Sequence, residues 1–324
     1  MTIIRNEQCR VLLATLVLLS VGWLAAPHAG QDGANDGFIL FATDRDNPSA
    51  LPICPTCEEI YVMSPDGLTP ATRLTENNAS DNGPVWSHSK KLIAFHSNRN
   101  GLPQIFLMNP DGTDQQMLIA GGVPDGGAFP SFSQSGNELC FNTQVRPRKI
   151  FVVNIQGTGL TNLTPEADAG DNLRCDWSPK KHRIAFGSSR AGNEEIYVMN
   201  ADGSDLLRLT NDPADGPTPL PVDANPAWSP KGDRIAFEST RDGNSEVYVM
   251  NADGGDPVRL TFFDGQDTKP TWSPKGDRIA FHRRIEGHLE VHTMNADGSD
   301  VFRITDTPGV GFSGFPSWGK WSAR

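Results

Sequence analysis

Four short hydrophobic stretches recur in a fixed order along most of the chain, and turn-forming residues separate them. In one copy they are "NPAWS" (225–229), "RIAFES" (234–239), "EVYVM" (246–250) and "VRLT" (258–261). β-Branched and aromatic residues dominate the stretches, while Gly, Asp, Asn and Pro fill the gaps, a pattern typical of strands joined by tight turns. In the third turn, "NADGG", Gly254 can adopt the positive φ that such a turn needs. Each copy therefore predicts four antiparallel strands.

The copies follow one another at an almost constant distance. The strip "WSPKGDRIAF" occupies 228–237 and 272–281, and the near copy "WSPKKHRIAF" occupies 177–186. The aromatic residues that open the copies are Trp86, Phe132, Trp177, Trp228, Trp272 and Trp318. Their spacings are 46, 45, 51, 44 and 46 residues, and the longest spacing contains the Pro-rich loop 212–226. Such a period, with four strands per unit, is typical of a propeller blade.

Each of the four strand positions occurs six times. The second strands are marked by Phe41, Phe95, Phe141, Phe186, Phe237 and Phe281, the third by Tyr61, Phe106, Phe151, Tyr197, Tyr248 and His292, and the fourth by Leu74, Leu118, Leu163, Leu209, Leu260 and Ile304. The stretch "GFILFATDRD" (37–46) is a second strand without a first, and "FPSWGKWSAR" (315–324) is a first strand without a second. We therefore expect an all-β, six-bladed propeller over 37–324, closed by the C-terminal strand joining the N-terminal blade.

The first 30 residues have a different character. Arg5 and Arg10 precede a 16-residue apolar run at 11–26. A basic segment followed by such a run is typical of an export signal, and the run is short for a membrane span. We expect residues 1–30 to be a signal peptide, with an uncleaved anchor as the alternative, and 31–36 to be a short linker.

The repeat unit "WSPKGDRIAF…STRDGNSEVYVMNADGGDPVRLT" (228–261) resembles the TolB-type propeller repeat, and the resemblance extends from Gly37 to Trp318. The resemblance implies an exported bacterial protein that works by binding other envelope proteins. Proteins of the TolB family in the strict sense carry an extra N-terminal α/β domain ahead of the propeller. The segment between the apolar run and Gly37 has no room for it, so we expect this chain to lack that domain. Propellers of this type also precede hydrolase domains in some peptidases, and some form lyases.

Two polar positions recur on the face of the ring that carries the second turns and the connections between blades, here called the second-turn face. An Asp or Asn lies five residues before the opening Trp, at Asp81, Asn172, Asp223 and Asp267. An Arg lies four residues after the marker Phe, at Arg45, Arg99, Arg190 and Arg241. Counting outward from the hairpin turns pairs Asp81 with Arg99, Asn172 with Arg190 and Asp223 with Arg241. We favour the interpretation that these are structural cross-strand pairs.

A second interpretation makes this face a polar rim at the mouth of the channel, which receives a charged segment of a partner. Asp267 is its leading candidate, because Ile285 stands where the matching Arg would be. The candidate partner-binding residues are Asp81, Asp223, Asp267, Pro219 and Pro221.

The cysteines of the exported part suggest one disulfide. "CPTC" (54–57) lies in the long second turn of the first blade, where a thioredoxin-type site would need a strand-to-helix junction. In an exported protein, a local Cys54–Cys57 disulfide is the favoured interpretation. Cys140 occupies a core position that matches Ala236, so we expect it to be buried and free. Cys175 lies in a different blade.

Motifs that resemble metal or catalytic sites have simpler explanations. The turns "NADGSD" at 200–205 and 295–300 lack the third acid and the Glu of a calcium loop, and turn chemistry accounts for them. In "HLEVH" (288–292) the alternate residues share one strand face and could meet a cation, but we favour surface polar residues. "GSSRA" (187–191) aligns with the repeat and is not a nucleophile elbow. We expect no cofactor, no metal and no catalytic residue.

Two classes of function follow. The leading one is an exported, non-enzymatic scaffold, periplasmic or secreted and monomeric, that binds an envelope or secreted protein or peptide at the channel mouth. The alternative is a carbohydrate-active or metal-dependent enzyme, of lyase or hydrolase type, that uses His and acidic residues at the channel mouth. The formal net charge of −11 argues against nucleic-acid binding, which needs a basic surface. Beyond the signal we expect no membrane insertion.

Overall fold

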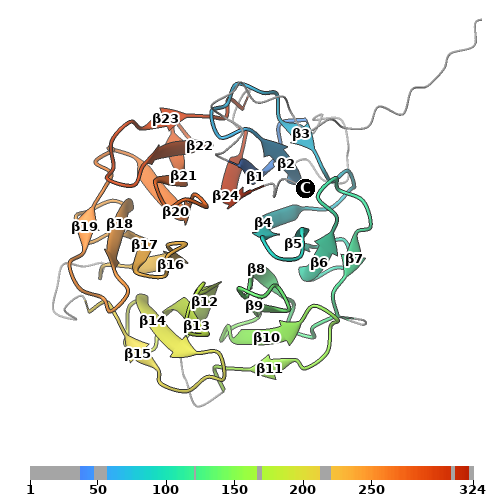
Figure 1. Cartoon of the computed structure of the whole chain (residues 1–324), viewed down its shortest axis with the longest axis horizontal. Coiled ribbons are helices and arrows are strands. Elements are labelled where there is room, and N and C mark those ends of the chain that lie inside the picture. The colour runs from blue at the N-terminus through green and yellow to red at the C-terminus, as the bar shows by residue number, and fades with distance from the viewer. Residues whose placement is uncertain are drawn as a thin grey trace, which may run out of the picture.

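The fold is a ring of six four-stranded antiparallel sheets (Figure 1). The computed structural model describes residues 37–46, 57–119, 122–165, 170–211, 220–307 and 311–320. Within them every regular element is a strand. The prediction of an all-β, six-bladed propeller is therefore confirmed. The signal peptide and linker, 1–36, lie outside the described residues.

Each blade contributes one strand to each of four positions. The inner strands, which line the channel, are β24 (Ser313–Gly319), β4 (Asp81–Ser87), β8 (Ala128–Phe132), β12 (Asn172–Trp177), β16 (Asp223–Trp228) and β20 (Gln266–Trp272). The second strands are β1 (Phe38–Thr43), β5 (Leu92–Ser97), β9 (Glu138–Asn142), β13 (Arg183–Ser188), β17 (Arg234–Ser239) and β21 (Arg278–Ile285). We number the blades 1 to 6 in this order.

The outer half of each blade completes the sheet. The third strands are β2 (Glu59–Met63), β6 (Gln104–Met108), β10 (Ile150–Asn154), β14 (Glu195–Asn200), β18 (Glu246–Asn251) and β22 (His288–Asn295). The fourth strands are β3 (Thr72–Arg73), β7 (Gln116–Met117), β11 (Thr161–Asn162), β15 (Leu207–Arg208), β19 (Val258–Arg259) and β23 (Phe302–Arg303). These outer strands are only two residues long, which limits the exposed sheet edge.

The two ends of the propeller meet in blade 1. β24 pairs antiparallel with β1, and Phe38 lies opposite Gly319. In Figure 1 the red strand β24 lies beside the blue strand β1. As predicted, the C-terminal strand completes the blade that β1 begins.

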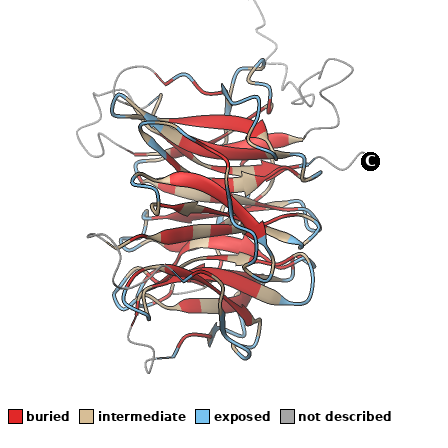
Figure 2. Cartoon of the chain, turned by 90° about the vertical axis from the view of Figure 1, so that its left-hand side faces the viewer, coloured by how far each residue is buried: buried red, intermediate tan, exposed pale blue. Residues whose placement is uncertain are grey.

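The core repeats with the sequence. All six marker Phe side chains of the second strands are fully buried, and each pairs in register with the third-strand marker, as Phe237 does with Tyr248. Between blades, aromatic residues also meet, and the rings of Phe38 and Trp86 lie 5.0 Å apart, edge to face. Figure 2 shows the buried positions along the strands and the exposed ones at the turns of both faces. The periodic aromatic residues therefore build the blades and the contacts between them.

A disulfide joins blades 3 and 4, which corrects the expectation that Cys140 is free. Cys140 on β9 is bonded to Cys175 on β12, with 6.3 Å between their Cα atoms. Cys140 is buried as expected, but its strand packs face to face on the inner strand of the next blade. Residues assigned to different blades are neighbours for that reason. Cys57 is also disulfide-bonded. Cys54 lies outside the described residues, so the Cys54–Cys57 pairing stays a prediction.

Within the described part of the chain, no helix is long and apolar enough to cross a bilayer.

Candidate functional site

Each inner strand carries one β-bulge, and the six bulges together form a ring in the channel. In every inner strand the register with the second strand shifts three residues before the opening aromatic residue. The bulged residues, here called the channel ring, are Gly83, Phe129, Arg174, Asn225, Lys269 and Phe315. Their φ angles lie between 51° and 56°. A bulge leaves its residue unpaired and redirects the side chain, so each blade presents one variable side chain to the channel.

Side chains of neighbouring strands hold the bulges in this strained conformation. The backbone N–H of Arg174 donates to Asn142 Oδ1 at 3.1 Å, and that of Lys269 donates to Glu238 Oε2 at 3.1 Å. The N–H of Phe129 donates to His96 Nδ1 at 3.4 Å. Non-glycine residues at positive φ persist only where their surroundings enforce it, and they concentrate at functional sites.

Proline follows the bulged residue in five of the six inner strands. An inner strand is the edge of its sheet, where the missing N–H costs no ladder hydrogen bond. In blade 4 the residue after Arg174 is Cys175, which forms the disulfide with Cys140. The backbone beside Arg174 is thus fixed covalently to the preceding blade.

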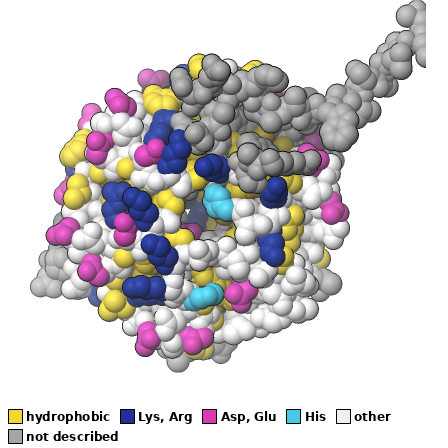
Figure 3. Space-filling model, viewed as in Figure 1, with side chains coloured by type: hydrophobic (Ala, Val, Ile, Leu, Met, Phe, Trp, Pro, Cys, Tyr) yellow, Lys and Arg dark blue, Asp and Glu magenta, His cyan; other side chains and the backbone are white. Residues whose placement is uncertain are grey.

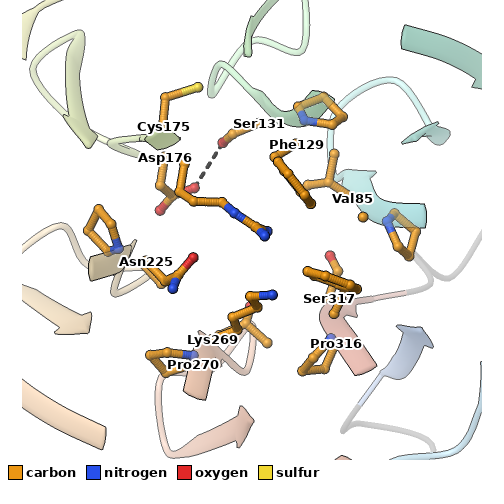
Figure 4. Close-up of a pocket in the computed structure, with 18 residues that line it drawn as sticks. Val85, Phe129, Ser131, Cys175, Asp176, Asn225, Lys269, Pro270, Pro316 and Ser317 are labelled. Carbon is orange, nitrogen blue, oxygen red and sulfur yellow. Dashed lines mark hydrogen bonds between the residues drawn. The ribbon is translucent and has the colours of Figure 1, made fainter. Parts of the chain in front are cut away.

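Aromatic and cationic side chains of the channel ring pack together. The rings of Phe129 and Phe315 lie 5.5 Å apart. The Cζ atom of Arg174 lies 3.1 Å from the centroid of Phe129 and 5.0 Å from that of Phe315, and Lys269 Nζ lies 3.7 Å from Phe315. Figure 4 shows Phe129, Asn225 and Lys269 pointing from different blades into one shared space. These cation–π contacts hold two positive charges at the centre of the propeller.

Two adjoining cavities occupy the channel. One has a volume of about 140 Å³ and is lined by the channel ring and the residues that follow it. The other, of about 270 Å³, shares Phe129, Arg174, Asn225 and Lys269 with the first, and Gln144 from a second turn also lines it. It therefore extends toward the second-turn face. In the space-filling view down the ring axis the centre is open, and Lys and Arg side chains gather around the opening (Figure 3).

Burial in the narrow channel shifts the pKa values of its charged groups. It lowers the pKa of Arg174 to about 9, although the carboxylates of Glu238 and Glu194 oppose the shift. It lowers the pKa of Lys269 well below its usual range, and the charge of Arg174 adds to that effect. Burial, followed by the charge of Glu238, raises the pKa of Glu194 to about 7. The channel thus holds charges that little water stabilises.

The two channel histidines are neutral at neutral pH. Burial, followed by the charges of Arg174 and Lys269, lowers the pKa of His96 to about 3. Burial also lowers the pKa of His282 well below its usual value, with Lys269 as the next cause. The ring of His282 lies 5.7 Å from that of Phe315. Both histidines therefore contribute polar ring atoms rather than charge.

Asp176 joins three inner strands behind the channel ring. Its Oδ1 accepts from Ser131 Oγ of β8 at 2.8 Å, and its Oδ2 accepts from the backbone N–H of Trp228 of β16 at 2.7 Å. Burial raises the pKa of this carboxyl to about 6. Asp176 therefore fixes the strand that carries Arg174 relative to its neighbours on both sides.

The polar pairs expected from the repeat lie over the blade cores. Arg99 Nη2 lies 2.8 Å from Asp81 Oδ2, and Arg241 Nη2 lies 2.6 Å from Asp223 Oδ2. The third pair is Arg190 Nη2 with Asn172 Oδ1, at 2.8 Å. Each Arg also covers an aromatic pair, as Arg241 does with Phe237 and Tyr248 at 5.6 and 5.1 Å. The Asp and Asn side chains are fully buried, so a partner could touch them only if these pairs opened.

The expectation that Asp267 lacks an Arg is wrong. Arg283 Nε and Nη2 donate to its two carboxylate oxygens at 2.7 and 2.6 Å. Arg283 lies directly opposite Asp267, at the position that Ser97, Ser188 and Ser239 occupy in the other paired blades. In blade 6 the Arg therefore stands two residues after the marker Phe, whereas in those blades it stands four residues after it.

The prolines of the proposed rim lie away from the channel ring. Pro221 is buried, and its carbonyl accepts from Asn193 Nδ2 at 3.0 Å. Pro219 lies outside the described residues. Partner binding by the rim residues stays a prediction.

The interpretation of "HLEVH" as surface polar residues is wrong for two of its members. Glu290 and His292 are buried, at 3% and 4% exposure. Glu290 accepts from the backbone N–H of Thr307 at 2.8 Å, and His292 stacks on Phe281 at 5.8 Å in the place where the other blades have Tyr or Phe. In the described residues no three His, Cys, Asp or Glu side chains gather as metal ligands would.

Sequence reasoning missed the channel ring, although the repeat contains the signal. The position three residues before the opening aromatic residue carries five different residue types in the six blades, with Phe occurring twice. The residue that follows it is Pro in five of the six blades. A position that varies within an otherwise repeated motif lies where the blades need not be alike. The side chain at that position points into the channel only because the strand bulges there. The alternation of a regular strand does not predict such a bulge.

Comparison with known proteins places this geometry among TolB-like propellers. No protein-family model matches the chain. A "Protein TolB homolog" of Chlorobium luteolum is 27% identical over 165 residues, which are 50% of this chain and 35% of that protein. The chain thus spans about a third of that relative's length. The crystal structure of TolB from Acinetobacter baumannii matches with a TM-score of 0.73 and 21% identity, covering 89% of this chain and 68% of that one.

An enzyme shares the architecture. Oligogalacturonate lyase from Vibrio parahaemolyticus matches with a TM-score of 0.53 and 15% identity, covering 82% of this chain and 73% of that one. The fold alone therefore does not separate binding proteins from enzymes. The described part of this chain is therefore a six-bladed β-propeller, closed between β24 and β1, that is similar to TolB proteins in sequence and in fold.

Proposed function

We propose that this chain is an exported scaffold that binds a protein or peptide partner at the mouth of its channel on the second-turn face. The observation that carries the proposal is the channel ring, in which five non-glycine residues are held at positive φ. Their side chains differ from blade to blade, so the channel has distinct walls that a single partner segment can recognise. The similarity to TolB proteins supports the same function.

The shape of the mouth also supports a binding role. The larger cavity opens toward the second-turn face and has Gln144 and Arg148 of blade 3 on one side and Glu194 of blade 4 on another. Such a mixed polar wall suits hydrogen bonding to a peptide, while Phe129 offers apolar contact deeper in the channel. Partner-binding surfaces commonly combine an aromatic anchor with a polar rim.

Capture of the partner tests the proposal. The tagged protein is expressed in its native cells, crosslinked, purified and analysed for bound proteins. Gln144→Trp fills the mouth, whereas Gln156→Trp adds the same bulk to an exposed turn on the opposite face. We expect an envelope or secreted protein to be captured by the wild type and Gln156→Trp and to be lost with Gln144→Trp. Recovery of a glycan or metal without protein would instead favour the carbohydrate-active or metal-dependent enzyme.

A further inference from the structure

Two cations in the channel lack the carboxylate partner that several partly buried arginines have. Arg99, Arg241 and Arg283 each bond to an Asp at 2.6 to 2.8 Å. Within the described residues, no ion pair and no side-chain hydrogen bond engages the guanidinium of Arg174 or the ammonium of Lys269. Both instead contact the ring of Phe315. Two like charges against one aromatic ring repel each other, and an anion between them would remove that cost.

The packing of Arg174 leaves its donors available. The guanidinium lies over the face of Phe129, with 3.1 Å from Cζ to the ring centroid. Stacking covers the flat face of the guanidinium, whereas its N–H groups point outward in its plane. A carboxylate accepts two parallel hydrogen bonds from such an edge. The ammonium of Lys269, 3.7 Å from the centroid of Phe315, has three further donors.

The acidic groups of the channel only partly balance this charge. The carboxylates of Glu194 and Glu238 act on Arg174 and raise its pKa, but burial still lowers it to about 9. Glu194 has a pKa of about 7, so it is partly protonated at neutral pH. Arg284 adds positive charge nearby, and so does Arg148, although Asp171 lies 3.6 Å from the Arg148 guanidinium. The cavity therefore favours an anion and disfavours a divalent cation.

We propose that the channel ring is a carboxylate-binding site, in which Arg174 and Lys269 hold the carboxylate beside the paired rings of Phe129 and Phe315. This inference rests on the proposed function, because it names the chemistry of the group that the mouth admits. The adjoining cavities, of about 140 and 270 Å³, suit a short organic acid or the last residue of a peptide. They lie below the ~300–1,000 Å³ of pockets for larger ligands.

Calorimetry with a matched pair of small probes tests the site. Glutarate carries two carboxylates, and glutaramide has the same carbon skeleton without charge. We expect glutarate to bind the wild-type protein at least tenfold more tightly than glutaramide. Lys269→Met should weaken glutarate binding at least tenfold, and so should Arg174→Gln. Lys231→Met removes the same charge from an exposed turn and should leave the affinity unchanged.

Two results would overturn the site. The first is equal affinity for glutarate and glutaramide, and the second is unchanged glutarate binding by Lys269→Met with an unchanged melting temperature. If Arg174→Gln does not fold, because Arg174 packs on Phe129, the Lys269→Met variant decides alone.

The source of the carboxylate is settled by a second comparison. A neutral Gly/Ser pentapeptide with a free C-terminal carboxylate is compared with its C-terminal amide. Tighter binding of the peptide acid than of glutarate, lost on amidation, assigns the site to a chain terminus. Tighter binding of glutarate assigns it to a free acid. If the wild-type protein does not bind glutarate while Gln144→Trp still abolishes capture of the partner protein, the carboxylate site is wrong and the scaffold proposal stands. If glutarate binds and no partner is captured, the scaffold proposal fails alone.

Discussion

At the scale of single residues, Asp176 illustrates how one side chain can hold three blades together. Replacing it with Ala leaves the N–H of Trp228 and the hydroxyl of Ser131 without their acceptor. We expect Asp176→Ala to lower the free energy of unfolding by about 2–3 kcal/mol, the usual cost of an unsatisfied buried partner. Chemical denaturation measures the loss. Asp264→Ala, at an exposed carboxylate, should stay within ~0.5 kcal/mol of the wild type. Equal losses in both variants would contradict the role of Asp176.

The same residue predicts a pH dependence of stability. The folded pKa of Asp176 is about 6 and is raised by burial, whereas its ordinary value is 3.8. The folded state then binds the proton more tightly than the unfolded state, so stability falls as the pH rises between these two values. Asp176→Asn cannot titrate. From pH 5 to pH 7 the wild type should lose on the order of 1 kcal/mol relative to Asp176→Asn. Parallel stability curves for the two proteins would show that the folded pKa is not raised.

At the scale of strands, the disulfide-bonded Cys175 occupies the position that Pro takes in the other inner strands. The residue after the bulge is Pro in the other five inner strands, and an Ala or Leu precedes the marker Phe in the other second strands. Cys140→Ala/Cys175→Ala should lower the free energy of unfolding by ~2–4 kcal/mol, because the unfolded chain loses its cross-link. Cys140→Ala/Cys175→Pro should recover part of that loss, ~0.4–1 kcal/mol, because Pro restricts the unfolded chain. Thermal unfolding compares the variants. A double-alanine variant as stable as the oxidised wild type would contradict the prediction.

Strands also show which features sequence could predict. The period of the aromatic residues predicted the number, order and closure of the strands, because each Phe of a second strand must meet an aromatic residue of the third. The Arg283–Asp267 pair was missed because Arg283 stands two residues after the marker Phe, where the other paired blades have Ser, instead of four residues after it. The disulfide and the channel ring were missed for another reason. Cys175 and Arg174 act across blades and through a bulge, whereas the pattern along one strand describes only that strand's own pairing.

At the scale of the whole molecule, closure of the ring by β24 should not depend on where the chain begins. Every blade has the same strand order, so a permuted chain that links Lys320 to Gly37 and opens the first turn of blade 3 between Ser135 and Gly136 restores the same closure there. We expect this permutant to keep a melting temperature within a few degrees of the wild type, because neighbouring repeats interact equivalently.

Removing residues 313–324 should behave differently. The deletion exposes the edge of β1 and removes the buried Trp318, whose loss alone costs ~3–5 kcal/mol. We expect the melting temperature to fall by ~10 °C or more. Phe315 disappears as well, so glutarate binding should be lost while the permutant keeps it. Differential scanning calorimetry and the glutarate titration read the two effects separately. A truncated protein with wild-type stability would mean that the other five blades hold the ring without closure. A permutant that folds but no longer binds glutarate would mean that the bulges of blades 1 and 3 depend on chain order.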